Sequence, residues 1–122
     1  MKIAVVYLAK TDEVVAFDFD ETKNPYFEFS RILDVDSVEI IKTKKMRDMT
    51  LDKETGMYLC MAVDEIGLWN ENPIENNLGS YLYEGIIVGD IILTKYKEDG
   101  EFSTPIGFDS LEEANEWLAK IK

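Results

Sequence analysis

Histidine is absent from this chain of 122 residues, and cysteine occurs once. Without an imidazole, a Ser/His or Cys/His nucleophilic pair and a histidine metal site are excluded. One thiol closes no disulfide within the chain and builds no zinc site from several thiolates. Cys60 lies inside an apolar run, so we predict a buried structural thiol in a protein of the reducing cytoplasm.

Basic residues are scarce as well: 13 lysines and arginines stand against 25 acids, which gives a net charge of −12. Duplex nucleic acids and anionic membranes are bound largely through lysine and arginine, so we expect neither as a direct partner. Long apolar runs are also missing, and none approaches the ~20 residues that cross a bilayer, so we expect no membrane-spanning helix. The acidic excess serves solubility alone or complements a basic protein surface.

The apolar segments predict a single domain over residues 1–122, since no repeat, low-complexity tract or linker divides the chain. A short helix is predicted between Pro25 and Leu33. The apolar start is followed by a polar stretch at the place where a signal peptide would have its small-residue cleavage site. We therefore predict that this start is a first strand and not a signal peptide. Strands are predicted at residues 2–9, 14–19, 38–43, 57–63 and 86–96, with a turn at 97–100 leading to a further segment at 101–104.

The end of the sequence has the pattern of an amphipathic helix. Ser110 followed by Glu113 forms a capping box. Apolar residues then recur at helical spacing, at Leu111, Ala114, Trp117, Leu118 and Ile121. We therefore expect Trp117 on the buried face. The predicted fold is α+β, a mixed or antiparallel sheet of five to six strands with this helix packed on it.

The polar connection at residues 64–77 lies between two aliphatic segments and admits two interpretations. Trp69, Asn72 and Asn76 offer a stacking face and amide groups, which suit recognition of a polar planar ligand. The same composition suits a loop that turns on asparagine caps and buries Trp69 in the core.

Four of the 13 basic residues fall within residues 42–47. Lys42, Lys44 and Lys45 could hold a phosphate or a small nucleotide, or they could be solvated lysines that protect a sheet edge. If a small anionic ligand exists, we expect it between these lysines and the asparagine-rich connection. Such a site needs the chain to fold back, or a second subunit to supply the loop, so a homo-oligomer is one expectation.

One short motif resembles an enzyme family. A hydrophobic strand followed by Asp18-Phe19-Asp20-Glu21-Thr22 is similar to the first motif of the haloacid-dehalogenase phosphatases. The resemblance implies that Asp18 is a nucleophile and Asp20 a general acid/base beside Mg²⁺, with Asp90 in the late metal motif. The chain departs from the family, because it lacks a clear crossover helix and a second aspartate after Asp90. We therefore expect no phosphatase activity.

A second resemblance covers residues 32–94. The residues Asp64-Glu65-x-Gly67-Leu68, Asn72-Pro73-x-x-Asn76 and Gly89-Asp90 resemble a family of small uncharacterised proteins of phages and mobile elements of Gram-positive bacteria. The resemblance implies a small α+β domain but no reaction, and proteins of that setting often inhibit host factors.

The sequence therefore favours a non-enzymatic binding protein, without a cofactor, that acts on a host protein or sequesters a small anionic ligand. Three alternatives stay open at this point: a Mg²⁺-dependent phosphatase using Asp18 and Asp20, an acidic DNA mimic, and an assembly component.

Overall fold

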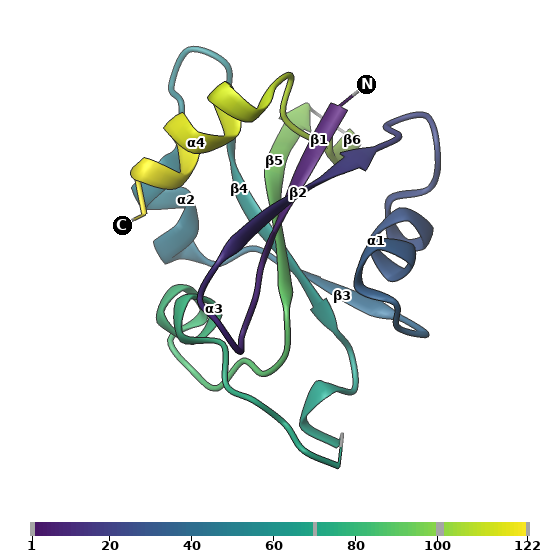
Figure 1. The fold of residues 1–122 in the computed structure, drawn as a ribbon. Helices are drawn as coiled ribbons and strands as arrows, with labels where there is room; N and C mark the ends of the chain where they lie inside the picture. The colour runs from purple at the N-terminus through teal and green to yellow at the C-terminus, as the bar shows by residue number, and fades with distance from the viewer. Residues whose placement is uncertain (1, 70, 100–101, 122) are drawn as a thin grey trace.

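A six-stranded antiparallel sheet runs through the computed structural model, which describes residues 2–69, 71–99 and 102–121 (Figure 1). Within these residues the strands are β1 (Lys2–Tyr7), β2 (Val14–Phe19), β3 (Val38–Ile41), β4 (Met57–Asp64), β5 (Ile91–Asp99) and β6 (Phe102–Pro105). The helices are α1 (Pro25–Leu33), α2 (Lys44–Thr50), α3 (Asn77–Tyr83) and α4 (Leu111–Ala119), with a 3₁₀ turn η1 (Gly67–Trp69). The predicted α+β class is confirmed, and every pairing of the sheet is antiparallel.

β5 lies at the centre of the sheet, whose order is β2-β1-β5-β4-β3. β4 covers one edge of β5, while β1 and β6 share the other edge at opposite ends of the strand. β4 and the first part of β5 are buried on both faces, which explains why they read as continuous aliphatic runs in the sequence. β2 is an outer strand, and its residues 15–18 are exposed, whereas Phe19 at its end is buried.

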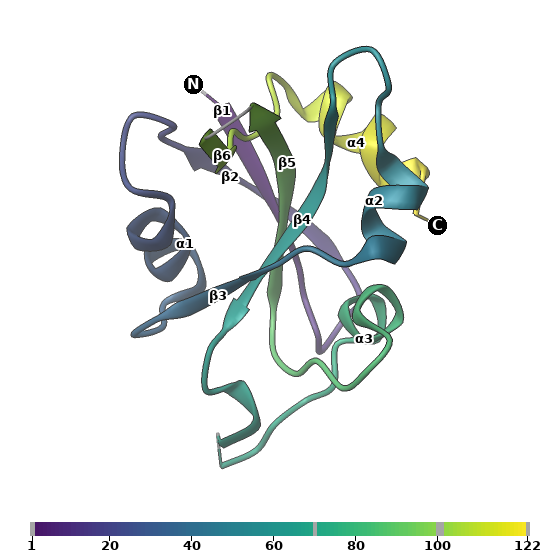
Figure 2. The same ribbon diagram turned by 180° about the vertical axis from the view of Figure 1, so that it is seen from behind.

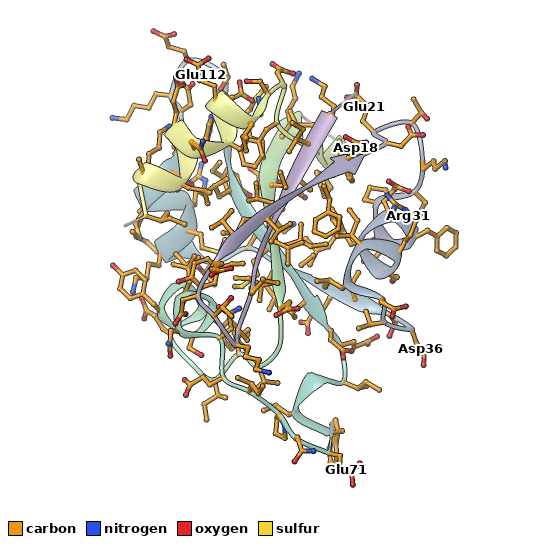
Figure 3. The ribbon with its side chains drawn as sticks, in the orientation of Figure 1. Asp18, Glu21, Arg31, Asp36, Glu71 and Glu112 are labelled. Atoms are coloured by element: carbon orange, nitrogen blue, oxygen red, sulfur yellow. The ribbon has the colours of Figure 1, made fainter. Side chains whose placement is uncertain are left out.

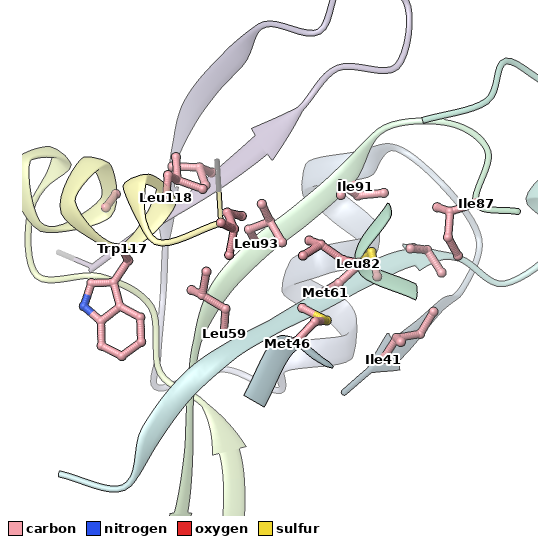
Figure 4. Close-up of a cluster of buried hydrophobic side chains, with 14 of the residues drawn as sticks. Ile41, Met46, Leu59, Met61, Leu82, Ile87, Ile91, Leu93, Trp117 and Leu118 are labelled. Carbon is pink, nitrogen blue, oxygen red and sulfur yellow. The ribbon is translucent and has the colours of Figure 1, made fainter. Parts of the chain in front are cut away.

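The helices cover the two faces of the sheet unequally. α2, α3 and α4 lie on one face and α1 lies on the other (Figures 1 and 2). Under the three helices is the larger core, where Trp117 and Leu118 of α4 lie beside Leu59 and Leu93 of the central strands (Figure 4). Under α1 is a smaller cluster, in which the rings of Phe19 and Phe29 stack with centroids 5.3 Å apart.

The predicted C-terminal helix is confirmed, and its cap also attaches it to the sheet. The Ser110 hydroxyl accepts a hydrogen bond from the Glu113 N–H at 3.1 Å. Glu113 in turn accepts from the Asp109 N–H and forms an ion pair at 2.6 Å with the buried Lys95 of β5. Trp117 is only 7% exposed, as expected for a core residue.

Cys60 is completely buried among β-strand side chains, and burial raises the pKa of its thiol to about 12. Because the thiolate is the reactive species, we expect no alkylation of the native protein by iodoacetamide at pH 8 and rapid alkylation once urea unfolds it. Mass spectrometry of both samples measures this. Alkylation of the native protein at the rate of the unfolded one would contradict the buried structural role predicted from the sequence.

Several elements differ from the sequence-based expectation. β1 ends at Tyr7 rather than at residue 9, and β5 continues to Asp99, where a turn was predicted at 97–100. The segment predicted as a strand over residues 86–96 becomes β5 only at Ile91, because Gly89 adopts a left-handed conformation with φ +79°. β3 ends before Thr43, because the Thr43 side chain accepts from the Met46 N–H and begins α2. Neither α2 nor α3 was predicted, although Thr43 and Asn76 are typical N-cap residues.

Candidate functional site

Large apolar side chains are exposed around the connection between β4 and β5, at the lower end of the molecule in Figure 1. Trp69 is 86% exposed, Leu68 62% and Ile86 63%, and the ring of Tyr83 is about half exposed beside them. We call these four residues the Trp69 surface. The interpretation that Trp69 is buried in the core is therefore wrong.

The Trp69 surface borders a pocket of about 160 Å³. Its buried lining residues are apolar or small: Ile41, Val63, Gly67, Ile87 and Val88. Its outer lining also includes Glu39, Asp64 and Glu65. Ligand pockets for small molecules usually measure ~300 to 1,000 Å³, so this one has room for a single side chain rather than for a nucleotide.

A buried asparagine holds the connection against the sheet. The Asn76 amide donates hydrogen bonds to the carbonyl oxygens of Tyr7 and Gly89, each at 3.0 Å, and its Oδ1 accepts from the Gly79 N–H at 2.9 Å. Its backbone N–H donates to the Ile87 carbonyl at 2.8 Å. All polar groups of this completely buried side chain thus form hydrogen bonds inside the fold.

Close packing and turn bonds fix the remainder of the connection. Gly79 faces Ile87 so closely that a Cβ at residue 79 would lie 2.8 Å from Ile87 Cγ2, which explains a glycine within α3. The Asp64 carboxylate accepts from the Ile66 N–H at 3.1 Å, and the Trp69 N–H donates to the Ile66 carbonyl at 2.9 Å. The exposed side chains of η1 are therefore presented by an ordered backbone.

A second, open concavity of about 600 Å³ adjoins the first one and shares Tyr83 with it. It lies between α2 and α3, and two of the predicted ligand-binding lysines line it. Lys44 pairs with Asp48 at 2.5 Å. Lys45 donates to the Tyr81 carbonyl at 2.8 Å and lies 4.0 Å from Glu84. Both lysines therefore have acceptors within the protein.

The six predicted ligand-binding residues are only partly brought together. Lys44 and Lys45 share the α2–α3 concavity, and Trp69 borders the neighbouring pocket. Asn72 lines a separate depression beside Lys10. Lys42 donates to the Tyr96 hydroxyl at 2.8 Å, in a depression with the start of α1, and this hydrogen bond raises the pKa of Lys42.

The sequence analysis missed Leu68, Tyr83 and Ile86, which belong to the Trp69 surface. The signal was available in Leu68, an apolar residue next to Trp69 in a mostly polar connection. Ile86 was hidden because it was assigned to the central strand, where an apolar residue is ordinary.

The phosphatase-like motif makes a turn at the end of an outer, antiparallel strand. Asp20 accepts hydrogen bonds from the hydroxyl and the N–H of Thr22, at 2.6 and 3.0 Å, and these lower its pKa. Asp90 lies elsewhere and accepts from the Ala9 N–H. In the part of the chain that the structure describes, no group of three or more acidic or cysteine side chains is placed to hold a metal ion.

Glu28, next to this motif, is a buried carboxylate. Arg31 donates to both of its oxygens, at 3.2 and 3.0 Å, and these bonds hold the pKa of Glu28 below its usual value. The lowered pKa stabilises the fold above the unfolded-state pKa of about 4.3, and this stabilisation is lost as the pH falls through the folded-state pKa.

We expect Glu28→Gln to lower the free energy of unfolding by about 1 kcal/mol at pH 7, because Arg31 is largely exposed and screened by water. Below about pH 4 the difference from the wild type should shrink. Urea denaturation at several pH values measures both quantities. A difference that grows on acidification would show that Glu28 is not stabilising as a carboxylate.

Acidic residues lie on several sides of the molecule. Figure 3 shows Asp18, Asp36, Glu71 and Glu112 at separate points of the periphery, pointing in different directions. These four carboxylates do not form the row on one face that a DNA mimic would present.

Comparison with protein-family models, curated proteins and solved structures gives no match to this chain. Among the described helices, none has the length and apolar character to cross a membrane. The assignment of function therefore depends on the site geometry.

Proposed function

We propose that this chain is a non-enzymatic binding protein of phage or mobile-element origin that acts in the host cytoplasm by docking onto a host protein through the Trp69 surface. The observation that carries this proposal is the exposure of Trp69, 86%, beside an apolar pocket. Exposed apolar patches mark interaction sites, and tryptophan is enriched among the residues that dominate binding energy.

A protein partner fits the site better than a small anionic ligand. The pocket at Trp69 has the volume of one side chain, and its lining includes no lysine or arginine among the described residues. The adjoining lysines are paired with Asp48 and Glu84. An anion would have to displace those carboxylates before it could use the lysine charges.

The resemblance to phage and mobile-element proteins supports the proposed origin. It covers the part of the chain that carries the Trp69 surface. Asp64, Gly67 and Leu68 line the pocket, while Asn76 and Gly89 fasten the connection that carries it. Several residues of the resemblance thus build or hold the backbone that presents the Trp69 surface.

Affinity capture with matched variants tests the proposal. Wild type, Trp69→Ala and Phe27→Ala are immobilised and exposed to host lysate, and retained proteins are quantified by mass spectrometry. Phe27 is the control, because it is also an exposed aromatic residue, 76% exposed, but lies on α1. We expect a protein that wild type and Phe27→Ala retain and Trp69→Ala loses. Equal retention by all three would contradict the proposal.

A further inference from the structure

The geometry points to the chemistry of the partner: we propose that the Trp69 surface binds a protein segment with an apolar anchor side chain flanked by lysine or arginine. This inference depends on the proposed function and adds the partner's class to it. The anchor enters the pocket lined by Val63, Ile87 and Leu68, and the basic flanks meet the carboxylates at its rim.

The charges around the pocket select a basic partner. Glu39 and Glu65 line it and form no ion pair with any described residue. Glu65 accepts one hydrogen bond, from the Ser37 hydroxyl at 2.8 Å, which leaves its negative charge in place. A lysine or arginine that docks here gains an ion pair at each carboxylate, whereas an acidic partner is repelled.

The carboxylates are also placed to act together. Glu39 is opposite Val63 in the β3–β4 pairing, so its side chain stands on the same face of the sheet as that pocket residue. Glu65 follows directly after β4, and the Glu65 N–H donates to the Ser37 carbonyl at 3.2 Å. Both acids therefore come from the β3–β4 edge, on backbone that is hydrogen-bonded.

The space around the pocket suits an extended or helical segment. The pocket holds about 160 Å³ and accepts one anchor, while the adjoining concavity of about 600 Å³ continues past Tyr83 and gives the rest of the segment a path. A second copy of this chain is a poorer occupant, because it brings the same carboxylates and a net charge of −12.

Selection from a displayed library of random linear peptides tests the inference. The library is selected on wild type and depleted on Trp69→Ala. Enriched peptides are synthesised with a fluorescent label, and their affinity is measured by anisotropy at low and high salt. We expect an apolar residue with neighbouring lysine or arginine in the enriched peptides, and weaker binding at high salt.

Two charge variants separate a local from a global effect. Glu39→Gln/Glu65→Gln should weaken the binding of an enriched peptide by about threefold to tenfold, because each rim ion pair contributes modestly. Glu112→Gln/Glu116→Gln removes the same charge from exposed residues of α4 and should leave binding unchanged. Equal effects of the two double variants would overturn the inference.

The remaining outcomes distinguish this inference from the proposed function. Enriched peptides that are apolar but not basic would overturn the partner's class and leave the Trp69 surface as a docking site. A library with no peptide specific for wild type would overturn the proposal that the partner is a linear segment. The affinity capture would still decide the proposed function. Sedimentation of wild type as a dimer that Trp69→Ala dissociates would assign the surface to a second copy and overturn the inference.

Discussion

Trp117→Ala is expected to lower the free energy of unfolding by about 3 to 5 kcal/mol, the largest effect of any single substitution considered for this protein. The indole is 7% exposed and packs within the core between α4 and the central strands. Removing it leaves a cavity that the flanking strands cannot close without moving. For a domain of this size the loss is a large share of the total stability.

Trp69→Ala is the matched control, because it removes the same side chain from an exposed position. We expect it to change the stability by less than about 0.5 kcal/mol. Urea denaturation, followed by circular dichroism, gives the midpoint for both variants. A Trp117→Ala midpoint equal to that of the wild type would show that α4 does not pack on the sheet as described.

Asn76→Ala is expected to cost about 3 kcal/mol. The substitution leaves the carbonyl oxygens of Tyr7 and Gly89 and the N–H of Gly79 without their partner in a buried place, and it removes the N-cap of α3. The Trp69 surface should lose its order at the same time, so partner binding should fall with stability. The stability is measured by urea denaturation.

Asn76→Asp separates the two parts of that effect. The aspartate keeps the acceptor for Gly79 but turns the amide donors into a buried carboxylate oxygen that faces two carbonyls. Burial raises the folded-state pKa of such a group above its unfolded value. The loss in the free energy of unfolding of Asn76→Asp relative to wild type should therefore shrink as the pH falls through the folded-state pKa. A deficit that is independent of pH would contradict this account of residue 76.

Much of the fold was predictable, because its signals are local. The capping box at Ser110 and the helical spacing up to Ile121 specify α4, and alternating or continuous apolar runs specify the strands. The single domain over residues 1–122 stays a prediction, which rests on the absence of any divider in the sequence. α2 escaped prediction because its sequence is charged and short, and its burial depends on Met46 meeting β4 and α3.

The site was harder to predict, because its properties are tertiary. Asn72 and Asn76 are the same residue type in the same connection, yet Asn72 is exposed and Asn76 is completely buried. Asn76 is buried because its amide meets the carbonyl oxygens of Tyr7 and Gly89, and this contact cannot be read from the sequence. Lys42 and Lys44 are two residues apart, yet Lys42 follows the end of β3 whereas Lys44 begins α2, and they face different surroundings. The closeness of these lysines in the sequence therefore predicted a larger basic cluster than the structure forms.

The most direct test of the central claim is a calorimetric titration of the purified protein that affinity capture identifies. It is titrated into wild type, Trp69→Ala and Phe27→Ala. If the Trp69 surface is the docking site, Trp69→Ala should raise the Kd at least about tenfold, since a central tryptophan contributes about 2 kcal/mol or more. Phe27→Ala should keep the wild-type Kd. A Kd that is the same for all three proteins would contradict the assignment of the Trp69 surface as the binding site.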